Sequence, residues 1–342
     1  MLLNAVRLFI VAVLAWFIWS QFRELDGAQV LRLLEGIGGA AALIVLPYGT
    51  VILLDAAGWR QCVTGSEHVP LREMFVIRLS TDAVMNTFPA GVAFAETLRP
   101  LLLRDRFGLR MTDAVASTLL SKINIAVAQI GFIITGLIFA FSLHASSLGE
   151  LGLFSSPSSI AGTFLLAASA GIVLSLPYSG ARLTQITALL GRIRIPLLQR
   201  GAARIRNAVA DIDRYVTGFA RHHRTRLLRA LLLFLLSWFA MAFETWLILA
   251  LLGSGMSIMQ AIALEATLSV VKLVFFFIPS AIGAQEVGIL SILTAFAIPE
   301  AAAIAAAFII LRRGKELLWA CSGISLFAYL RVNPFKPAFM KA

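Results

Sequence analysis

Long apolar runs fill most of the chain, and polar residues gather in the short stretches between them. Several runs extend for about 18 residues or more with few charges, which is long enough for a helix to cross the roughly 30 Å hydrocarbon layer of a membrane. We therefore expect an all-α integral membrane protein, a polytopic helical bundle in a single transmembrane domain over residues 1–342. Uninterrupted spans are expected at about 4–21, 38–57, 113–143, 160–178, 227–252 and 301–330.

Two further apolar segments, about 75–103 and 258–298, are broken in the middle by polar residues and helix breakers. The first contains NTFPAGVAFAETLRP and the second contains FFFIPSAIGAQEVG. Each break holds a proline, which lacks an amide hydrogen, and a glycine, which permits a tight reversal: Pro89 and Gly91, then Pro279 and Gly283. We expect each segment to turn back before crossing, as a re-entrant helical hairpin whose freed backbone groups line a polar cavity.

The two broken segments can be overlaid on each other. An offset of 190 residues superposes similar residue types: Pro89 on Pro279, Glu96 on Glu286, and Lys122 on Arg312. The pattern predicts two repeat units, about 38–143 and about 227–330, which enter their hairpins from opposite sides of the membrane. Such an inverted repeat is the plan of many secondary transporters.

Composition agrees with a membrane protein, and charge predicts its orientation. Of the residues, 59% are hydrophobic and 14% are charged, and the formal net charge is +11. Eleven arginines lie between Arg182 and Arg229, so this stretch and both termini are expected on the cytoplasmic side. A second inner surface is expected at Arg99, Arg104, Arg106 and Arg110. Because the basic residues flank membrane segments, no nucleic-acid partner is expected.

The basic stretch, about 182–226, has a helical pattern of its own. Apolar residues recur at helical spacing between the arginines from Ile205 to Phe219. This predicts an amphipathic helix on the inner membrane surface, where it would attract anionic lipid headgroups. A solvated connector is the alternative.

Charged residues also fall inside the apolar segments, where each costs roughly 2.5–3.5 kcal/mol on insertion scales. We expect acid–base partners to line a path for a polar lipid headgroup: Glu96 with Lys122 and Glu286 with Arg312, with Gln285 and Asn86 on the same path. Further charges in supporting positions are Asp55, Asp82, Glu244, Glu265, Lys272, Arg313 and Glu316. The alternative is a set of structural ion pairs that hold the helices in register.

Catalytic and metal-binding motifs do not accompany these charges in the sequence. The histidines lack metal-ligand spacing, and the chain has no P-loop and no GxSxG nucleophile elbow. We therefore expect no metal, no cofactor and no enzymatic activity. A membrane-embedded lipid-modifying transferase stays open as an alternative, because carboxylates at membrane depth can do acid–base work.

The second broken segment and the span after it resemble a known family. They read FIPSAIGAQEVGILSILTAFAIPEAAAIAAAFIILRRGKELLW, with a PxxxGxQExG pattern and a downstream RR-x-x-E. This is similar to the closing signature of the flippase-like family, the transmembrane region of lysylphosphatidylglycerol synthases. NTFPAGVAFAETLRPLLLRDRFG followed by ASTLLSKIN is similar to its earlier signature. The length resembles that of stand-alone members, and the RR-x-x-E ending resembles a subgroup found with hopanoid biosynthesis.

The resemblance implies translocation or export of an amphiphilic lipid across or from the bacterial inner membrane. The lipid would be a phospholipid, an aminoacyl-phospholipid or a hopanoid-type lipid. The implied partners are membrane lipids, with a homo-oligomer or lipid-biosynthesis enzymes as further candidates. A scaffold subunit of a lipid-biosynthesis complex is the remaining alternative, and in that case the deep charges would be dispensable.

Overall fold

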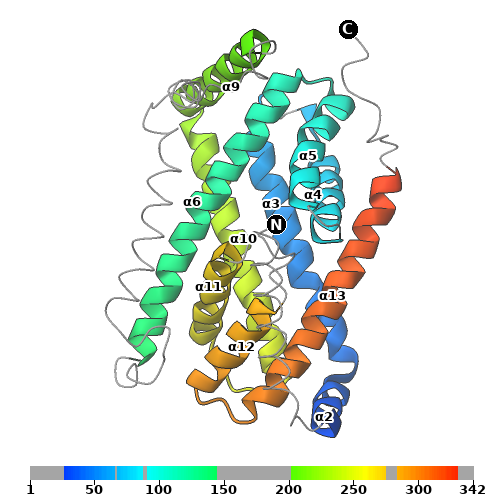
Figure 1. The fold of residues 1–342 in the computed structure, drawn as a ribbon, viewed down its shortest axis with the longest axis vertical. Helices are drawn as coiled ribbons and strands as arrows, with labels where there is room; N and C mark the ends of the chain where they lie inside the picture. Colours follow the sequence, from blue (N-terminus) through cyan, green and yellow to red (C-terminus); the bar gives the residue numbers. More distant parts are fainter. Residues whose placement is uncertain (1–26, 66–67, 88–90, 145–201, 275–282, 330–342) are drawn as a thin grey trace, which may run out of the picture. The chain divides into compact units, whose positions relative to one another are not determined.

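The computed structural model describes residues 27–65, 68–87, 91–144, 202–274 and 283–329. Its regular elements in these ranges are all helices (Figure 1). The predicted all-α class is therefore confirmed. The predicted spans at 4–21 and 160–178 lie outside the described residues, as do Pro89 and Pro279.

The helices follow the order of the predicted segments. They are α2 (Gly27–Ile37), the 3-10 helix η1 (Gly38–Ile44), α3 (Val45–Gln61), α4 (Leu71–Thr87), α5 (Gly91–Phe107), α6 (Met111–His144), α9 (Ala202–His222), α10 (Arg224–Leu251), α11 (Ile258–Val274), α12 (Ala284–Ala295) and α13 (Ala301–Tyr329).

Three helical stretches of the described residues are long and apolar enough to cross a membrane: Gly27–Gln61, Met111–Ala140 and Arg224–Leu251. The first is longer than the predicted span at 38–57, because α2, η1 and α3 follow one another without a break. At 1.5 Å per residue, the 29 residues of α13 extend for about 44 Å. Its length would also suffice, but α13 carries Arg312, Arg313, Lys315 and Glu316 near its middle.

In each broken segment the structure describes two helices, and the residues between them, 88–90 and 275–282, lie outside the described residues. In the first, α4 and α5 pack side by side, and in the second α11 packs against α12 (Figure 1). A Cβ at Gly91 would lie 2.4 Å from the carbonyl oxygen of Met85, so α5 begins too close to α4 for any side chain. Gly283, directly before α12, has φ 90°, a conformation that favours glycine. A side chain is therefore excluded at Gly91 by the closeness of α4, and it is disfavoured at Gly283 by the backbone conformation.

The described residues divide into two compact units, each of which holds one hairpin. The α4–α5 unit comprises residues 52–130, 202–237 and 320–329, and the α11–α12 unit comprises residues 27–51, 131–144 and 238–319, in each case as far as they are described. The long helices α3, α6, α10 and α13 contribute residues to both units.

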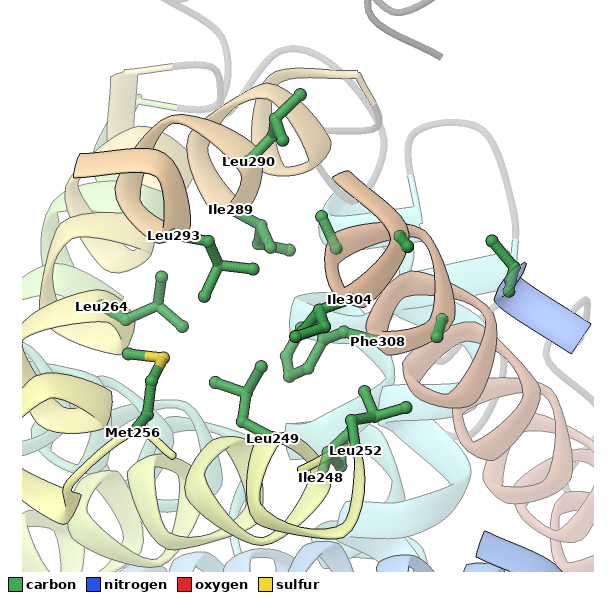
Figure 2. Close-up of a cluster of buried hydrophobic side chains, with 14 of the residues drawn as sticks. Ile248, Leu249, Leu252, Met256, Leu264, Ile289, Leu290, Leu293, Ile304 and Phe308 are labelled. Atoms are coloured by element: carbon green, nitrogen blue, oxygen red, sulfur yellow. The ribbon is translucent and has the colours of Figure 1, made fainter. Parts of the chain in front are cut away.

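An apolar core holds the α11–α12 unit together. Figure 2 shows side chains of four helices and one loop pointing toward one another: Ile248, Leu249 and Leu252 of α10, Met256, Leu264 of α11, Ile289, Leu290 and Leu293 of α12, and Ile304 and Phe308 of α13. Phe308 is fully buried and lies one helical turn before Arg312, whose guanidinium carbon is 5.7 Å from its ring centre. The core therefore fixes the face of α13 that presents its charges.

In each unit a glycine of a long helix contacts the first helix of the hairpin. A Cβ at Gly136 of α6 would lie 2.2 Å from the Cβ of Ala266 of α11. A Cβ at Gly323 of α13 would lie 2.6 Å from the carbonyl oxygen of Leu79 of α4. The long helix of each predicted repeat thus touches the hairpin of the other one. The boundaries of the repeats remain a prediction.

The basic stretch contains the helix α9, as its periodicity predicts. Its residues Val216 and Phe219 are buried, and the hydroxyl of Tyr215 donates to the carbonyl of Cys62 at 3.0 Å and accepts from the amide of Thr64 at 2.9 Å. Burial raises the pKa of this hydroxyl above its ordinary value, so it keeps its proton. The apolar side of α9 faces protein at these residues, and its place on the inner membrane surface stays a prediction.

Candidate functional site

Ionised side chains of the α4–α5 unit form a connected chain of ion pairs, which we call the α4–α5 network. It consists of Asp55, Arg78, Asp82, Glu96, Arg99 and Lys122. Arg78 on α4 pairs with Asp55 of α3 at 2.7 Å and with Asp82 one turn further along α4. Arg99 of α5 reaches the same Asp82 at 3.1 Å. These bonds tie both arms of the hairpin to the preceding helix.

One end of this network is open to the surroundings. A single oxygen of Glu96, Oε1, accepts from Arg99 at 2.8 Å and from Lys122 of α6 at 2.6 Å. The side chain of Arg99 is 3% exposed, whereas those of Glu96 and Lys122 are 33% and 37% exposed. The predicted contact between Glu96 and Lys122 is thus present, and a ligand could reach it without unfolding the unit.

Arg99 was expected to mark an inner surface of the membrane; the structure shows that it is buried within its unit, and its side of the membrane stays a prediction. Its guanidinium is buried between α4 and α5, where the hydroxyl of Thr81 accepts a further bond from Nε at 3.2 Å. A buried cation needs such partners, because an unpaired charge in a low-dielectric interior is costly.

Charged residues also connect the α11–α12 unit, in a second set that we call the α11–α12 network. It consists of Glu244, Glu265, Lys272, Glu286, Arg312, Arg313, Lys315 and Glu316. Glu265 of α11 is its most buried member, with 0% exposure. Arg312 donates to both of its oxygens at 3.1 Å, Lys272 donates at 3.2 Å, and the hydroxyl of Thr245 donates at 2.8 Å.

The hairpin glutamate Glu286 has a different partner from the one predicted. Its Oε1 accepts from Arg313 at 2.7 Å, and its Oε2 accepts from the backbone amide of Gly283 at 2.6 Å. Arg312, the predicted partner, binds Glu265 instead. The carboxylate therefore caps the first turn of α12 and links it to α13, in the manner of a glutamate at the third helical position. Arg313 also binds Glu316 at 2.7 Å, and both side chains are about one-third exposed.

Lys315 and Glu244 belong to this set by their place in the unit, and their pair joins α13 to α10. Lys315 donates to Glu244, and its ammonium lies 4.3 Å from the ring centre of Tyr48. Both charged side chains are almost fully enclosed. A carboxylate and an aromatic face are both favourable neighbours for a cation.

The structure brings most of the predicted residues into these two networks, with two exceptions. Gln285 is buried on α12, next to Glu286, and its amide carries no charge, so it is not counted among the ion pairs. Asn86 is exposed near the end of α4, and in the described part of the chain no bond joins it to the α4–α5 network.

Sequence reasoning gave no role at the site to Arg78, Lys315 and Thr245. The spacing offered a signal for Arg78, which stands four residues before Asp82, and for Arg99, three residues after Glu96, because such pairs are neighbours on a helix. Thr245 and Lys315 are joined to the network by contacts between distant segments, for which one sequence has no signal.

Each network balances its own charge. In the α4–α5 network three carboxylates face three cations, and in the α11–α12 network four carboxylates face four cations. Within the described residues no group of three or more His, Cys, Asp or Glu side chains could hold a metal ion.

The helices and the two networks define a polytopic α-helical membrane protein with compensated charges beside its helical hairpins. A family model, the lysylphosphatidylglycerol synthase TM region, matches residues 4–312, and the chain belongs to this family. A search of the curated proteins gave no match. The family supports a membrane function related to lipids.

Proposed function

We propose that this protein moves an amphiphilic lipid across or out of the bacterial inner membrane. The lipid is a phospholipid, an aminoacyl-phospholipid or a hopanoid-type lipid, and the protein does not alter it covalently. The observation that carries the proposal is the ion pair between Glu96 and Lys122, whose side chains are about one-third exposed although the pair continues a buried charge network.

The position of Lys122 along α6 supports this role. Lys122 lies 11 residues after Met111, where α6 begins, and Arg312 lies 11 residues after Ala301, where α13 begins. At 1.5 Å per residue each is about 16 Å from the start of its helix, near the middle of a roughly 30 Å hydrocarbon layer. Charges at that depth are expensive in lipid, and proteins retain them where polar molecules pass.

The geometry suggests how a headgroup would be received. An entering phosphate can take the place of the Glu96 carboxylate at Lys122, while Glu96 keeps its bond from Arg99. The exchange replaces one charged hydrogen bond by another, so the headgroup crosses the apolar layer without losing all of its polar partners. Asp82 holds Arg99 in place during the exchange.

We further propose that the two networks belong to the two halves of an inverted repeat, the plan of many secondary transporters. Both termini and α9 then lie on the cytoplasmic side, where exposed Arg221 and Arg224 attract anionic headgroups. Membrane lipids are the partners in this scheme, and a second copy of the chain or lipid-biosynthesis enzymes are proposed neighbours.

Purified protein in sealed vesicles tests the proposal. The vesicles contain a trace of phospholipid with a nitrobenzoxadiazole label, and dithionite, which does not cross the membrane, quenches only the outer leaflet. With the protein, and with or without an imposed proton gradient, the label of the inner leaflet should become accessible within minutes. Quenching that stops at the outer leaflet under both conditions, as in protein-free vesicles, contradicts lipid translocation.

A further inference from the structure

The charge balance of the α4–α5 network restricts the headgroup that it can accept. Asp55, Asp82 and Glu96 face Arg78, Arg99 and Lys122, so the described members have no net charge. The internal pairs Asp55–Arg78 and Asp82–Arg99 remain closed when the outer pair opens, because neither involves the Glu96–Lys122 bond. A bound headgroup therefore meets one carboxylate and one ammonium, and nothing else in the network offers it an excess of either charge.

We propose, building on the proposed function, that the headgroup bound between Glu96 and Lys122 is a neutral dipole that carries both a phosphate and an ammonium group. Its phosphate binds the Nζ of Lys122, and its ammonium binds Oε1 of Glu96 in the place that Lys122 leaves. Phosphatidylethanolamine has this chemistry.

Other headgroups leave a net charge behind. An anionic headgroup such as phosphatidylglycerol gives Lys122 a phosphate but brings nothing for Glu96 beyond its existing bond from Arg99. A cationic headgroup gives Glu96 an ammonium group but brings no anion to Lys122. A net charge in a site of low dielectric constant is unfavourable, whereas a dipole aligned with the opened pair keeps the whole site neutral. The network thus selects by net charge.

The preference can be measured by competition. Full-length protein in neutral detergent receives equal amounts of short-chain phosphatidylethanolamine and short-chain phosphatidylglycerol, and native mass spectrometry counts the bound lipid. We expect phosphatidylethanolamine to exceed phosphatidylglycerol by about tenfold, the ratio that corresponds to 1.4 kcal/mol. Equal binding, a preference for phosphatidylglycerol, or no binding of either lipid overturns the proposal.

Single variants should move the preference in opposite directions. Glu96→Gln leaves an excess cation and should turn the preference toward phosphatidylglycerol. Lys122→Gln leaves an excess carboxylate and should turn it toward an ethylphosphocholine lipid, whose phosphotriester is uncharged. The matched controls are Asp105→Asn and Arg110→Gln, which change the same charges at exposed pairs outside the network. If the controls shift the preference as much as the network variants do, the charge of the surface decides and the proposal fails.

Two further measurements keep the result unambiguous. Melting curves show whether each variant is folded. If a single variant is not folded, the double variant Glu96→Gln with Lys122→Gln replaces it in the experiment. This double variant should lose the tenfold preference for phosphatidylethanolamine. Glycerophosphoethanolamine has the same headgroup without acyl chains, and its competition at equal concentration would contradict a lipid ligand. Selective binding without transport would refute only the proposed function, and transport without selectivity would refute only this inference.

Discussion

Arg312 of α13 and Glu265 of α11 form a doubly hydrogen-bonded ion pair, with Nη1–Oε2 and Nη2–Oε1 distances of 3.1 Å each. Both side chains are buried, and Lys272 and Thr245 complete the surroundings of the carboxylate. A planar guanidinium matches a carboxylate at both of its oxygens, so this pair fixes the rotation of α13 relative to α11 as well as their distance.

Removing the carboxylate should therefore destabilise the fold strongly. Glu265→Gln leaves Arg312 and Lys272 without their main counter-ion, which costs about 3–5 kcal/mol when a buried pair is broken. The free energy of unfolding in detergent measures the effect. Asp211→Asn removes a carboxylate from an exposed pair with Arg214 and should cost about 1 kcal/mol or less. Similar losses in the two variants would contradict a structural role for Glu265.

The turn before α12 predicts a backbone effect. Gly283 has φ 90°, where an L side chain is strained by about 1–3 kcal/mol, so Gly283→Ala should lower stability by that amount. Gly314 lies inside α13, and a Cβ there would meet nothing within 4 Å. Gly314→Ala should therefore stabilise the helix by up to about 1 kcal/mol. Chemical unfolding of both variants tests the difference in sign, and two losses of equal size would refute the strained turn.

Close helix contacts predict a third effect. An alanine at Gly136 would place its Cβ 2.2 Å from Ala266, and an alanine at Gly323 would place it 2.6 Å from a carbonyl oxygen of α4. Neither neighbour is the flexible end of a long side chain, so the helices must separate, and overpacking of this kind costs about 1–3 kcal/mol. The melting temperatures of Gly136→Ala and Gly323→Ala should fall below that of Gly314→Ala. Unchanged melting would show that these helices are not in contact.

Cysteine labelling can test the proposed orientation. Thr225 is exposed at the start of the 28-residue helix α10, and Ser257 is exposed shortly after its end. In right-side-out vesicles Ser257→Cys should react with an impermeant maleimide, and Thr225→Cys should react only after permeabilisation. Both cysteine variants are made in a protein that carries Cys321→Ser, because Cys321 is exposed and would react itself. Cys62 can stay, because burial raises the pKa of its thiol to about 12 and keeps it unreactive. Labelling of Thr225→Cys from outside would reverse the orientation.

Much of the helical fold follows from the sequence, because long apolar runs and paired breakers are local signals. Helix α5 begins at Gly91 and α12 begins directly after Gly283, and α10 and α13 begin within three residues of their predicted starts. The relation of Glu96 to Lys122 was also accessible, since the overlay of the two segments pointed to acid and base at matching places.

The remaining contacts depend on helix rotation, which one sequence does not determine. Neighbouring residues Arg312 and Arg313 point to different sides of α13 and bind Glu265 and Glu286 respectively. A step of one residue turns a helix by about 100°, so an overlay that is accurate to one residue can still select the wrong arginine. The partner of Lys315 was also out of reach of the sequence, because Glu244 lies 71 residues earlier in the chain, on α10.

The central claim is that the partly exposed pair of Glu96 and Lys122 receives a lipid headgroup. Its most direct test is lipid movement in vesicles by the neutral double variant Glu96→Gln with Lys122→Gln. This variant leaves Arg99 with Asp82 and Arg78 with Asp55, so it should melt close to the wild-type temperature. A control, Arg110→Gln with Asp113→Asn, neutralises an exposed pair outside both networks. We predict that the control moves labelled lipid at the wild-type rate while the network variant is at least about tenfold slower, the effect of 1.4 kcal/mol on a barrier. A folded network variant that moves lipid at the wild-type rate would contradict the account and leave these charges as structural ties.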